Sequence, residues 1–470
     1  MIESPIDPAR HAVAALRPYV APVLRHAGWF GCFLVLAPVI GPRGYGLFML
    51  ALSGIAIAEA CLAETASQAL LNLAAVDERH LSTALVTMIA AGAAASLVLY
   101  ATTGALGLTL DGPTLADVFR SLAILPLLGA LSVAPSAVLR REGRQTPLVA
   151  ASTAGLAAGG GIAVSLAWAG AGPWSLVAQI IVQRLVECAV LWGMPSKRIG
   201  IVWSRRHFAE LIGALDWRAF AASGPAVSRF GPCLLVGLTL GPTATGLYML
   251  ASRLAEAFAD IVLAQEIRLV PRMVVQRACR VLLPAVLASA LLTIALLPLF
   301  DLRWWGAMFP AQILLLGAIP AGIILARTAC GDSASDEPRW QAVQAIGGLA
   351  IVALAVSYGL VAVAAASASW ATAIAVASLG PLRRQLGANW RAALPHAIRS
   401  CGGAAVAACL LFALAGPVGL VLAPVPALCL LTASGWLCYL IIRGEPANAE
   451  RPRMPFAGKI VAVAPADAGR

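Results

Sequence analysis

The sequence predicts an all-α membrane protein with about 14 transmembrane helices in two related halves, and three observations lead to this prediction. The 470-residue chain is 60% hydrophobic and 12% charged, with a mean hydropathy of +0.86. Soluble domains contain about 25% charged residues, so a fold surrounded by water could not bury this much apolar surface. The other two observations are a series of long uncharged runs and an internal repeat.

The uncharged runs are long enough to cross a bilayer, which takes about 20 predominantly apolar residues. Clusters of glycine and proline separate many of the segments, as expected for tight turns. The runs are residues 81–110, 145–183, 281–300, 304–326, 340–382 and 401–442. Three of them can hold two helices each. We expect helices centred near residues 34, 57, 95, 128, 158, 184, 230, 256, 290, 316, 349, 371, 407 and 430.

The repeat joins residues 41–51, GPRGYGLFMLA, to residues 241–251, GPTATGLYMLA, with seven of the 11 positions identical. Six predicted helices separate the two copies, and an even number preserves direction across the membrane. The halves are therefore expected to be parallel repeats around a central cavity. We predict an N-terminal lobe of helices 1–6 in residues 1–200, a C-terminal lobe of helices 7–12 in 201–395, and two additional helices with a cytoplasmic tail in 396–470.

The distribution of basic residues predicts the orientation, because cytoplasmic loops retain positive charge. Most of the 33 Lys and Arg residues fall in the termini and the even-numbered connections, whereas Arg43 and Arg303 fall on the opposite side. Both termini are thus expected in the cytoplasm. Arginine far outnumbers lysine, which occurs only at Lys197 and Lys459, and this usage indicates a bacterial source. Topology and attraction to anionic lipid heads account for the net charge of +11, so we expect membrane lipids and no nucleic acid as partners.

Several function classes lack their sequence signatures. No GxxxxGKS or GxxxxGKT loop is present, so the chain carries no nucleotide motor of that type. The 10 cysteines form no CxxC pair, and the five histidines are scattered without an HExxH motif. We therefore predict no catalytic residue, no metal site and no cofactor.

The connection between the halves, residues 197–218, contains a predicted surface helix. Phe208, Leu211, Ile212 and Leu215 recur at helical spacing and form one apolar face. Such an amphipathic helix is typical of the membrane surface. We interpret it as a tether between the halves, with a gating role as the alternative.

Charged residues inside apolar helices are the candidate functional residues, because each costs about 2.5–3.5 kcal/mol at the bilayer centre on insertion scales. Such a residue is expected to face a cavity or a partner. In the predicted eighth helix Arg253, Glu256 and Asp260 share one face at i, i+3 and i+7. The candidate substrate-binding residues are Arg229, Arg253, Glu256, Asp260, Glu59, Glu64, Arg184 and Glu187.

An internal ion pair between packed helices is the alternative to a cavity role. It stays open for the eighth helix and is favoured for Arg184 and Glu187, which lie outside the repeated motif. For Glu59 and Glu64 both interpretations remain.

For Arg229 the cavity role is the favoured interpretation. It has no acidic residue within one helical turn, and neighbouring glycines and prolines are expected to break its helix. Broken helices at membrane depth often present backbone groups to a substrate.

Four motifs in matching order carry a resemblance to a known family. They are GYGL at 44–47, PSAVLRREGR at 135–144, GAGPWSLVAQ at 170–179 and GLYMLASRL at 246–254. Over residues 20–280 the chain resembles the polysaccharide exporters and flippases of the multidrug, oligosaccharidyl-lipid and polysaccharide (MOP) export superfamily. One departure concerns the seventh helix, where Pro232 and Cys233 stand in place of an acidic residue common in such proteins.

The resemblance implies a two-lobed flippase that moves an undecaprenyl-diphosphate-linked glycan to the outer leaflet by alternating access, without making or breaking a bond. Helices 1, 2, 7 and 8 line the cavity in such proteins, which places Arg229 and Arg253 there. Glycan polymerases or glycosyltransferases are the expected protein partners. The alternatives are a cation-coupled multidrug antiporter of the same superfamily, an intramembrane glycan ligase or polymerase, and a structural membrane scaffold.

Overall fold

The computed structural model describes residues 8–73, 75–109, 113–194, 199–215, 217–258, 302–317 and 337–386. Every regular element within these ranges is a helix. The predicted helices near 290, 407 and 430, the candidate Asp260 and the predicted third domain lie outside the described residues.

The repeated sequence forms the same sharp turn in both copies. Helix α1, Pro8–Asn72, is kinked at Gly41, whose backbone angles are φ 69° and ψ 169°. Gly241, with φ 84° and ψ 176°, separates α9, Gly224–Leu240, from α10, Pro242–Phe258. Glycine adopts this region of positive φ with far less strain than other residues, so both copies require it. The predicted first and second helices are thus the two arms of α1, and α9 and α10 are their repeat mates.

Within each described range the remaining helices are joined by short connections, in agreement with the predicted segmentation. Each predicted helix centre within the described residues falls in a helix, and 340–382 is divided at Gly359, where φ is 98°. The elements are α2 Glu78–Thr109, α3 Pro113–Leu122, α4 Leu125–Arg141, α5 Gln145–Trp168, α6 Trp174–Trp192, α7 Arg205–Gly213, α8 Trp217–Ala221, η4 Leu302–Ala307, α13 Met308–Leu316, α15 Glu337–Ala355, η5 Val356–Tyr358 and α16 Leu360–Leu386.

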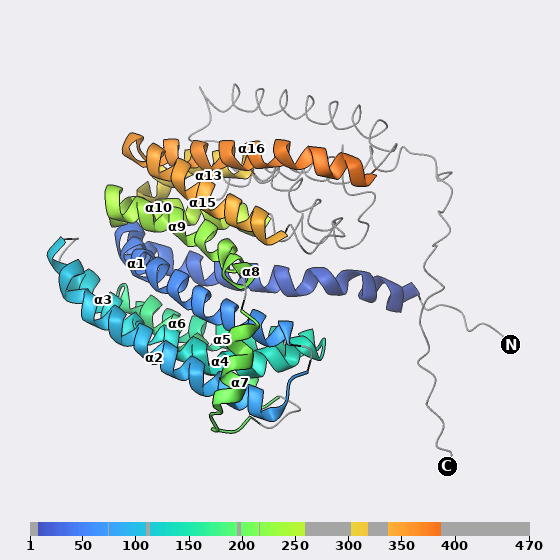
Figure 1. Cartoon of the computed structure of the whole chain (residues 1–470). Helices are drawn as coiled ribbons and strands as arrows, with labels where there is room; N and C mark the ends of the chain where they lie inside the picture. Colours follow the sequence, from blue (N-terminus) through green and yellow to red (C-terminus); the bar gives the residue numbers. More distant parts are fainter. Residues whose placement is uncertain are drawn as a thin grey trace, which may run out of the picture.

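Helix α1 lies between two groups of helices (Figure 1). Helices α2 to α6 lie on one side of it, and α9, α10, α13, α15 and α16 lie on the other. Helix α1 contacts α4 and α5 of the first group and α9 and α10 of the second. The repeat mates therefore pack directly against each other.

Seven stretches in the described residues are long and apolar enough to cross a membrane. They lie in α1, α2, α3 with α4, α5, α6, α15 and α16. This confirms the all-α multi-pass membrane protein. The total of fourteen helices and the three domain boundaries stay predictions.

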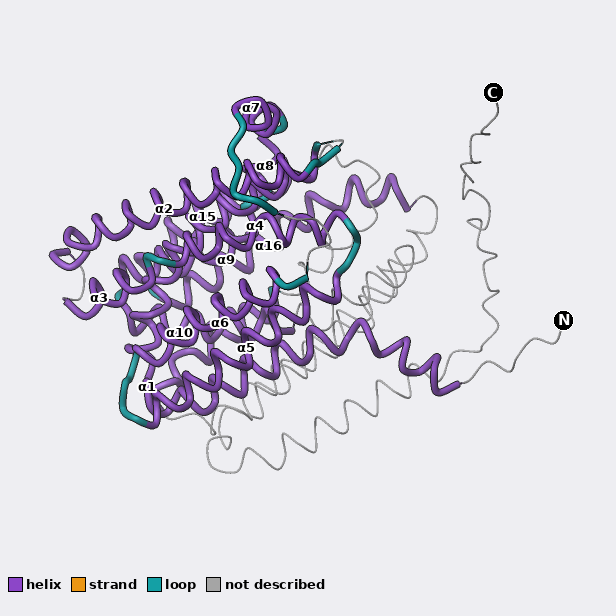
Figure 2. Tube along the Cα trace, turned by 90° about the horizontal axis from the view of Figure 1, so that it is seen from below, coloured by secondary structure: helices purple, strands orange, loops and turns teal. Residues whose placement is uncertain are grey.

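The even-numbered connections lie together at one end of the bundle. Arg141 Nη1 donates to the carbonyl oxygens of Leu70 and Leu73, each at 2.8 Å. Arg144 Nη1 donates to the carbonyl oxygen of Met194 at 3.3 Å, which joins the fourth connection to the sixth. Figure 2 shows α7 at the edge of the bundle, beside α8.

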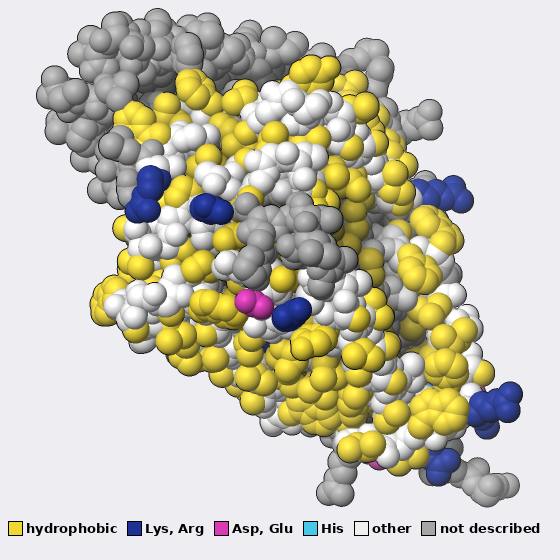
Figure 3. Space-filling model, turned by 90° about the vertical axis from the view of Figure 1, so that its left-hand side faces the viewer, with side chains coloured by type: hydrophobic (Ala, Val, Ile, Leu, Met, Phe, Trp, Pro, Cys, Tyr) yellow, Lys and Arg dark blue, Asp and Glu magenta, His cyan; other side chains and the backbone are white. Residues whose placement is uncertain are grey.

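The odd-numbered turns meet at the opposite end. A Cβ added at Gly44, beside the first turn, would lie 3.2 Å from the ring of Pro173 in the fifth connection. Arg303 Nη2 donates to the carbonyl oxygen of Pro38 at 2.8 Å. Viewed from this side, the surface is largely hydrophobic and its Lys and Arg side chains are few (Figure 3). The connections thus alternate between the two ends, as a multi-pass chain requires.

An aromatic cluster holds the kink of α1. Trp304 is fully buried and packs edge-on against Phe33 and Tyr45, with ring centroids 5.1 and 5.9 Å away. Its indole Nε1 donates to the carbonyl oxygen of Ala37 at 3.3 Å. Pro42 has no N–H, so the carbonyl oxygen of Pro38, four residues earlier, lacks its helical donor. Arg303 donates to this oxygen instead, and Trp304 adds a donor at the neighbouring carbonyl oxygen of Ala37.

Candidate functional site

Arg229, Arg253 and Glu256 form one charged group in the second half. Arg229 Nη2 lies 2.7 Å from Glu256 Oε2, and Arg253 Nη1 lies 3.3 Å from the same oxygen. One carboxylate oxygen thus meets two guanidinium groups on adjacent helices, and the three side chains together carry one net positive charge.

This group is partly open rather than sealed between helices. The side chains of Arg229, Glu256 and Arg253 are 39%, 30% and 18% exposed. The guanidinium carbon of Arg229 also lies 5.6 Å from the ring centroid of Phe230, within the range of a cation–π contact. Arg229 therefore has an acidic partner from α10, although none lies within a turn of it in the sequence.

The helix is not broken around Arg229, so the predicted position of the break is wrong. Helix α9 continues through Pro232, and the interruption falls earlier, between α8 and α9. Pro225 lies in the first turn of α9, where a backbone N–H has no intrahelical partner. Gly231 and Pro232 are buried, and Gly231 approaches Leu349 of α15, so packing supports the helix where Pro232 lacks a donor.

A second charged group lies in the first half and joins α1 to α6. Arg184 Nη2 lies 3.2 Å from Glu59 Oε1, and Arg184 Nη1 lies 3.5 Å from Glu187 Oε2. The Glu59 side chain is 10% exposed, whereas that of Arg184 is 37% exposed. Gly129 of α4 provides room for this carboxylate, since an added Cβ would lie 2.5 Å from Glu59 Oε1.

A cavity of about 580 Å³ adjoins the second group. Glu59, Glu64, Arg184 and Glu187 line it, together with Arg140, whose Nη1 lies 3.8 Å from Glu64 Oε1. Four serine hydroxyl groups lie along its walls, at Ser67, Ser132, Ser136 and Ser152. Three carboxylates against two guanidinium groups give this cavity the opposite charge balance to the Arg229 group.

The candidate residues that the structure describes thus fall into two separate groups. The cavity lies within the first half, between α1, α4, α5 and α6, whereas we had expected a chamber between the halves. The repeat preserves the turn but not the charges: 200 residues before Arg229, Arg253 and Glu256, the sequence has Trp29, Ser53 and Ala56. The basic side chain of Arg140 was missed, although its position in the PSAVLRREGR motif could have indicated it.

Comparison with solved structures identifies the class of fold. The lipid II flippase MurJ in its inward closed conformation has a TM-score of 0.66 at 11% identity, covering 92% of this chain and 98% of that one. An inward-facing multidrug resistance MATE family transporter of the MOP superfamily has a TM-score of 0.60 at 13% identity, covering 79% and 98%. A MOP superfamily transporter from Pyrococcus furiosus has a TM-score of 0.52 at 12% identity, covering 79% and 95%. The protein has the MOP transporter fold.

Sequence comparison then gives the family. Residues 35–270 match the family described as "Polysaccharide biosynthesis protein". The chain belongs to this family, which confirms the resemblance found in its motifs. A search of the curated proteins finds no match.

Proposed function

We propose that this protein is a flippase that moves a lipid-linked oligosaccharide or polysaccharide precursor across the bacterial inner membrane by alternating access. No bond is made or broken in this process. Membership of a polysaccharide biosynthesis family and the MOP transporter fold both support the proposal.

The observation that carries the proposal is the pair of guanidinium groups on one carboxylate at Arg229, Arg253 and Glu256. A diphosphate presents several anionic oxygens, and the forked donors of arginine suit two oxygens at once while remaining charged. The side chains of Arg229 and Glu256 are partly exposed, so protein does not seal this group off from a ligand. Glu256 provides one counter-charge shared by both guanidinium groups in the absence of substrate, and the remaining positive charge favours an anionic ligand.

The test is glycan export in cells that carry single variants. Arg229→Ala and Arg253→Ala are each expected to reduce surface polysaccharide at normal membrane levels of the protein. Arg229→Lys keeps the charge but loses the forked geometry, so an intermediate loss is expected. Arg120 lies in an exposed pair with Asp117 at 3.6 Å, and Arg120→Ala is the matched control. Normal export from both alanine variants at positions 229 and 253 would overturn the proposal.

A second candidate function is a cation-coupled multidrug antiporter, and the acidic cavity around Glu59 favours it. Its three carboxylates could accept a cationic compound. Uptake of cationic dyes into vesicles, compared between the native protein and Glu59→Gln, separates the two functions. If Glu59→Gln loses dye transport but keeps normal glycan export, the antiporter is favoured.

We further propose undecaprenyl diphosphate as the lipid carrier, a cytoplasmic location for both termini, and glycan polymerases or glycosyltransferases as protein partners. The distribution of Lys and Arg supports the orientation. Accessibility of cysteines introduced near each terminus to a membrane-impermeant thiol reagent tests it in intact cells.

A further inference from the structure

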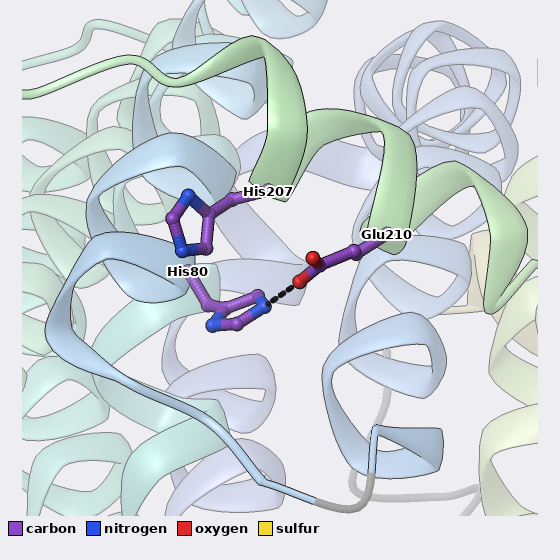
Figure 4. A group of neighbouring side chains, drawn as sticks. All are labelled: His80, His207 and Glu210. Atoms are coloured by element: carbon purple, nitrogen blue, oxygen red, sulfur yellow. Dashed lines mark hydrogen bonds and ion pairs between the residues drawn. The ribbon is translucent and has the colours of Figure 1, made fainter.

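His80 meets His207 and Glu210, which lie about 130 residues later in the sequence, at the end of the bundle that holds the even-numbered connections. His80 lies near the start of α2, and His207 and Glu210 lie one turn apart on α7 (Figure 4). One ligand atom from each residue lies within 4.8 Å of the other two. The two imidazole rings are 4.4 Å apart at 89°, and His80 Nε2 lies 2.7 Å from Glu210 Oε2.

The neighbours of these side chains orient them. His207 Nδ1 lies 2.8 Å from Ser204 Oγ, and an Nδ1–H that donates to this hydroxyl leaves Nε2 as the free nitrogen. Arg206 Nε donates to Glu210 Oε1 at 3.0 Å, which leaves Oε2 directed at His80. Hydrogen bonds from Arg206 and His80 lower the pKa of Glu210, so its carboxylate is ionised. Such second partners typically orient the ligands of protein-bound metals.

We propose that His80, His207 and Glu210 form a binding site for a divalent transition metal of the Zn²⁺ type, which fastens α7 to the first half of the protein. Two imidazole nitrogens and one carboxylate oxygen are a common three-ligand set for Zn²⁺, with a water in the fourth position. The His80 side chain is 8% exposed, so one ligand is already held in a packed environment.

Binding requires one proton rearrangement and a small movement. Without metal, His80 Nε2–H donates to Glu210, and the amide of Asp77 donates to His80 Nδ1 at 3.3 Å. The metal replaces the hydrogen on Nε2, Nδ1 becomes protonated, and the already long contact with Asp77 is lost. Ligand atoms on tetrahedral Zn²⁺ lie about 3.4 Å apart, so rotation of the side chains closes the site.

The site lies where a metal would restrain the connection between the halves. Leu211 of α7 is buried against Leu70, Val76 and Val138 of the first half. The chain continues from α7 through α8 to Arg229 in α9. A metal bridge between α2 and α7 would therefore fix one end of this connection.

The experiment measures Zn²⁺ binding to the full-length purified protein, after removal of any affinity tag, by competition with a chromophoric chelator. One site is expected in the native protein and in the control His26→Ala, which changes a histidine of α1. His207→Ala and Glu210→Gln are each expected to weaken binding at least tenfold. Zn²⁺ should also raise the Tm of the native protein and of His26→Ala, but not that of His207→Ala.

Two results would overturn the site: no Zn²⁺ bound by the native protein, or equal affinity in the native protein, His207→Ala and Glu210→Gln. If His207→Ala does not fold, Ser204→Ala provides the milder change. It keeps all three ligands and removes the partner of His207 Nδ1, so a weaker affinity supports the site and an unchanged affinity counts against it.

Discussion

Gly46 and Gly246 pack reciprocally against each other's segments. A Cβ added at Gly46 would lie 2.9 Å from the amide nitrogen of Gly246, and one added at Gly246 would lie 3.2 Å from the amide nitrogen of Gly46. Each added Cβ would also collide with the carbonyl oxygen of the proline in the partner copy, Pro242 or Pro42. Such mutual contacts between equivalent positions are the mark of a local two-fold relation. The two copies of the repeated sequence therefore form an interface with each other.

The first prediction concerns this contact. Gly46→Ala places a methyl group against backbone atoms that cannot rotate away, so we expect a loss of stability of about 1–3 kcal/mol or more. The measurement is the thermal midpoint in detergent. Gly161→Ala in α5 is the control, since its Cβ meets no atom within 4 Å and alanine favours helix. Equal midpoints for the two variants would show that the helices separate without cost.

The second prediction isolates the backbone strain of the turn. Gly241 has φ 84°, and a Cβ added there meets nothing within 4 Å, so Gly241→Ala acts through conformation alone. We expect a loss of about 1–3 kcal/mol. Gly31 in α1 also has open space around it, without a positive φ, and Gly31→Ala should be neutral or stabilising. A neutral Gly241→Ala would mean that the turn relaxes to another conformation.

The sequence alone predicts much of this architecture because the determining features are local or repeated. The apolar runs and the repeat indicate where most of the long described helices lie, and Gly41 and Gly241 share both sequence and conformation. The continuous course of α9 through Pro232 was not predictable, because packing against α15 supports it. Helix propensity, which depends on residue type alone, takes no account of that contact.

The charged groups show the limit of the same approach. The spacing of Arg253 and Glu256 predicts a shared helix face, and they meet at 3.3 Å. The contacts between helices, such as Arg229 with Glu256, depend on which helix packs beside which. His80 and His207 were considered scattered for the same reason, and the fold brings their rings to 4.4 Å.

The third prediction concerns the ion pair between Glu59 and Arg184. Arg184→Gln leaves a carboxylate that is 10% exposed without this counter-charge, and we expect a loss of about 3 kcal/mol. This is the lower end of the range for breaking a buried pair, because Arg184 is 37% exposed. Adding Glu59→Gln should recover much of the loss, since a neutral amide needs no counter-ion.

A double-mutant cycle of the free energy of unfolding measures this coupling, which we expect at about 1–3 kcal/mol. Arg120→Gln breaks the exposed pair with Asp117 and should cost at most about 1 kcal/mol. Strict additivity of Arg184→Gln and Glu59→Gln would show that the two side chains do not stabilise each other.

The fourth prediction concerns Trp304, which acts at the kink of α1 through both packing and a hydrogen bond. Trp304→Phe retains an aromatic ring beside Phe33 and Tyr45 but removes the donor to the carbonyl oxygen of Ala37. Because this hydrogen bond is buried, we expect its loss to cost about 0.5–1.5 kcal/mol, in addition to the cost of the space left by the smaller ring.

Trp304→Ala should cost about 3–5 kcal/mol, since it opens a cavity in the core. Thermal midpoints in detergent measure both effects, and Trp168→Phe is the control because Trp168 is 76% exposed. If Trp304→Phe were as stable as the native protein, the hydrogen bond to the carbonyl oxygen of Ala37 would contribute nothing to stability. The kink would then depend on Gly41 and Pro42 rather than on its contact with the segment 302–307.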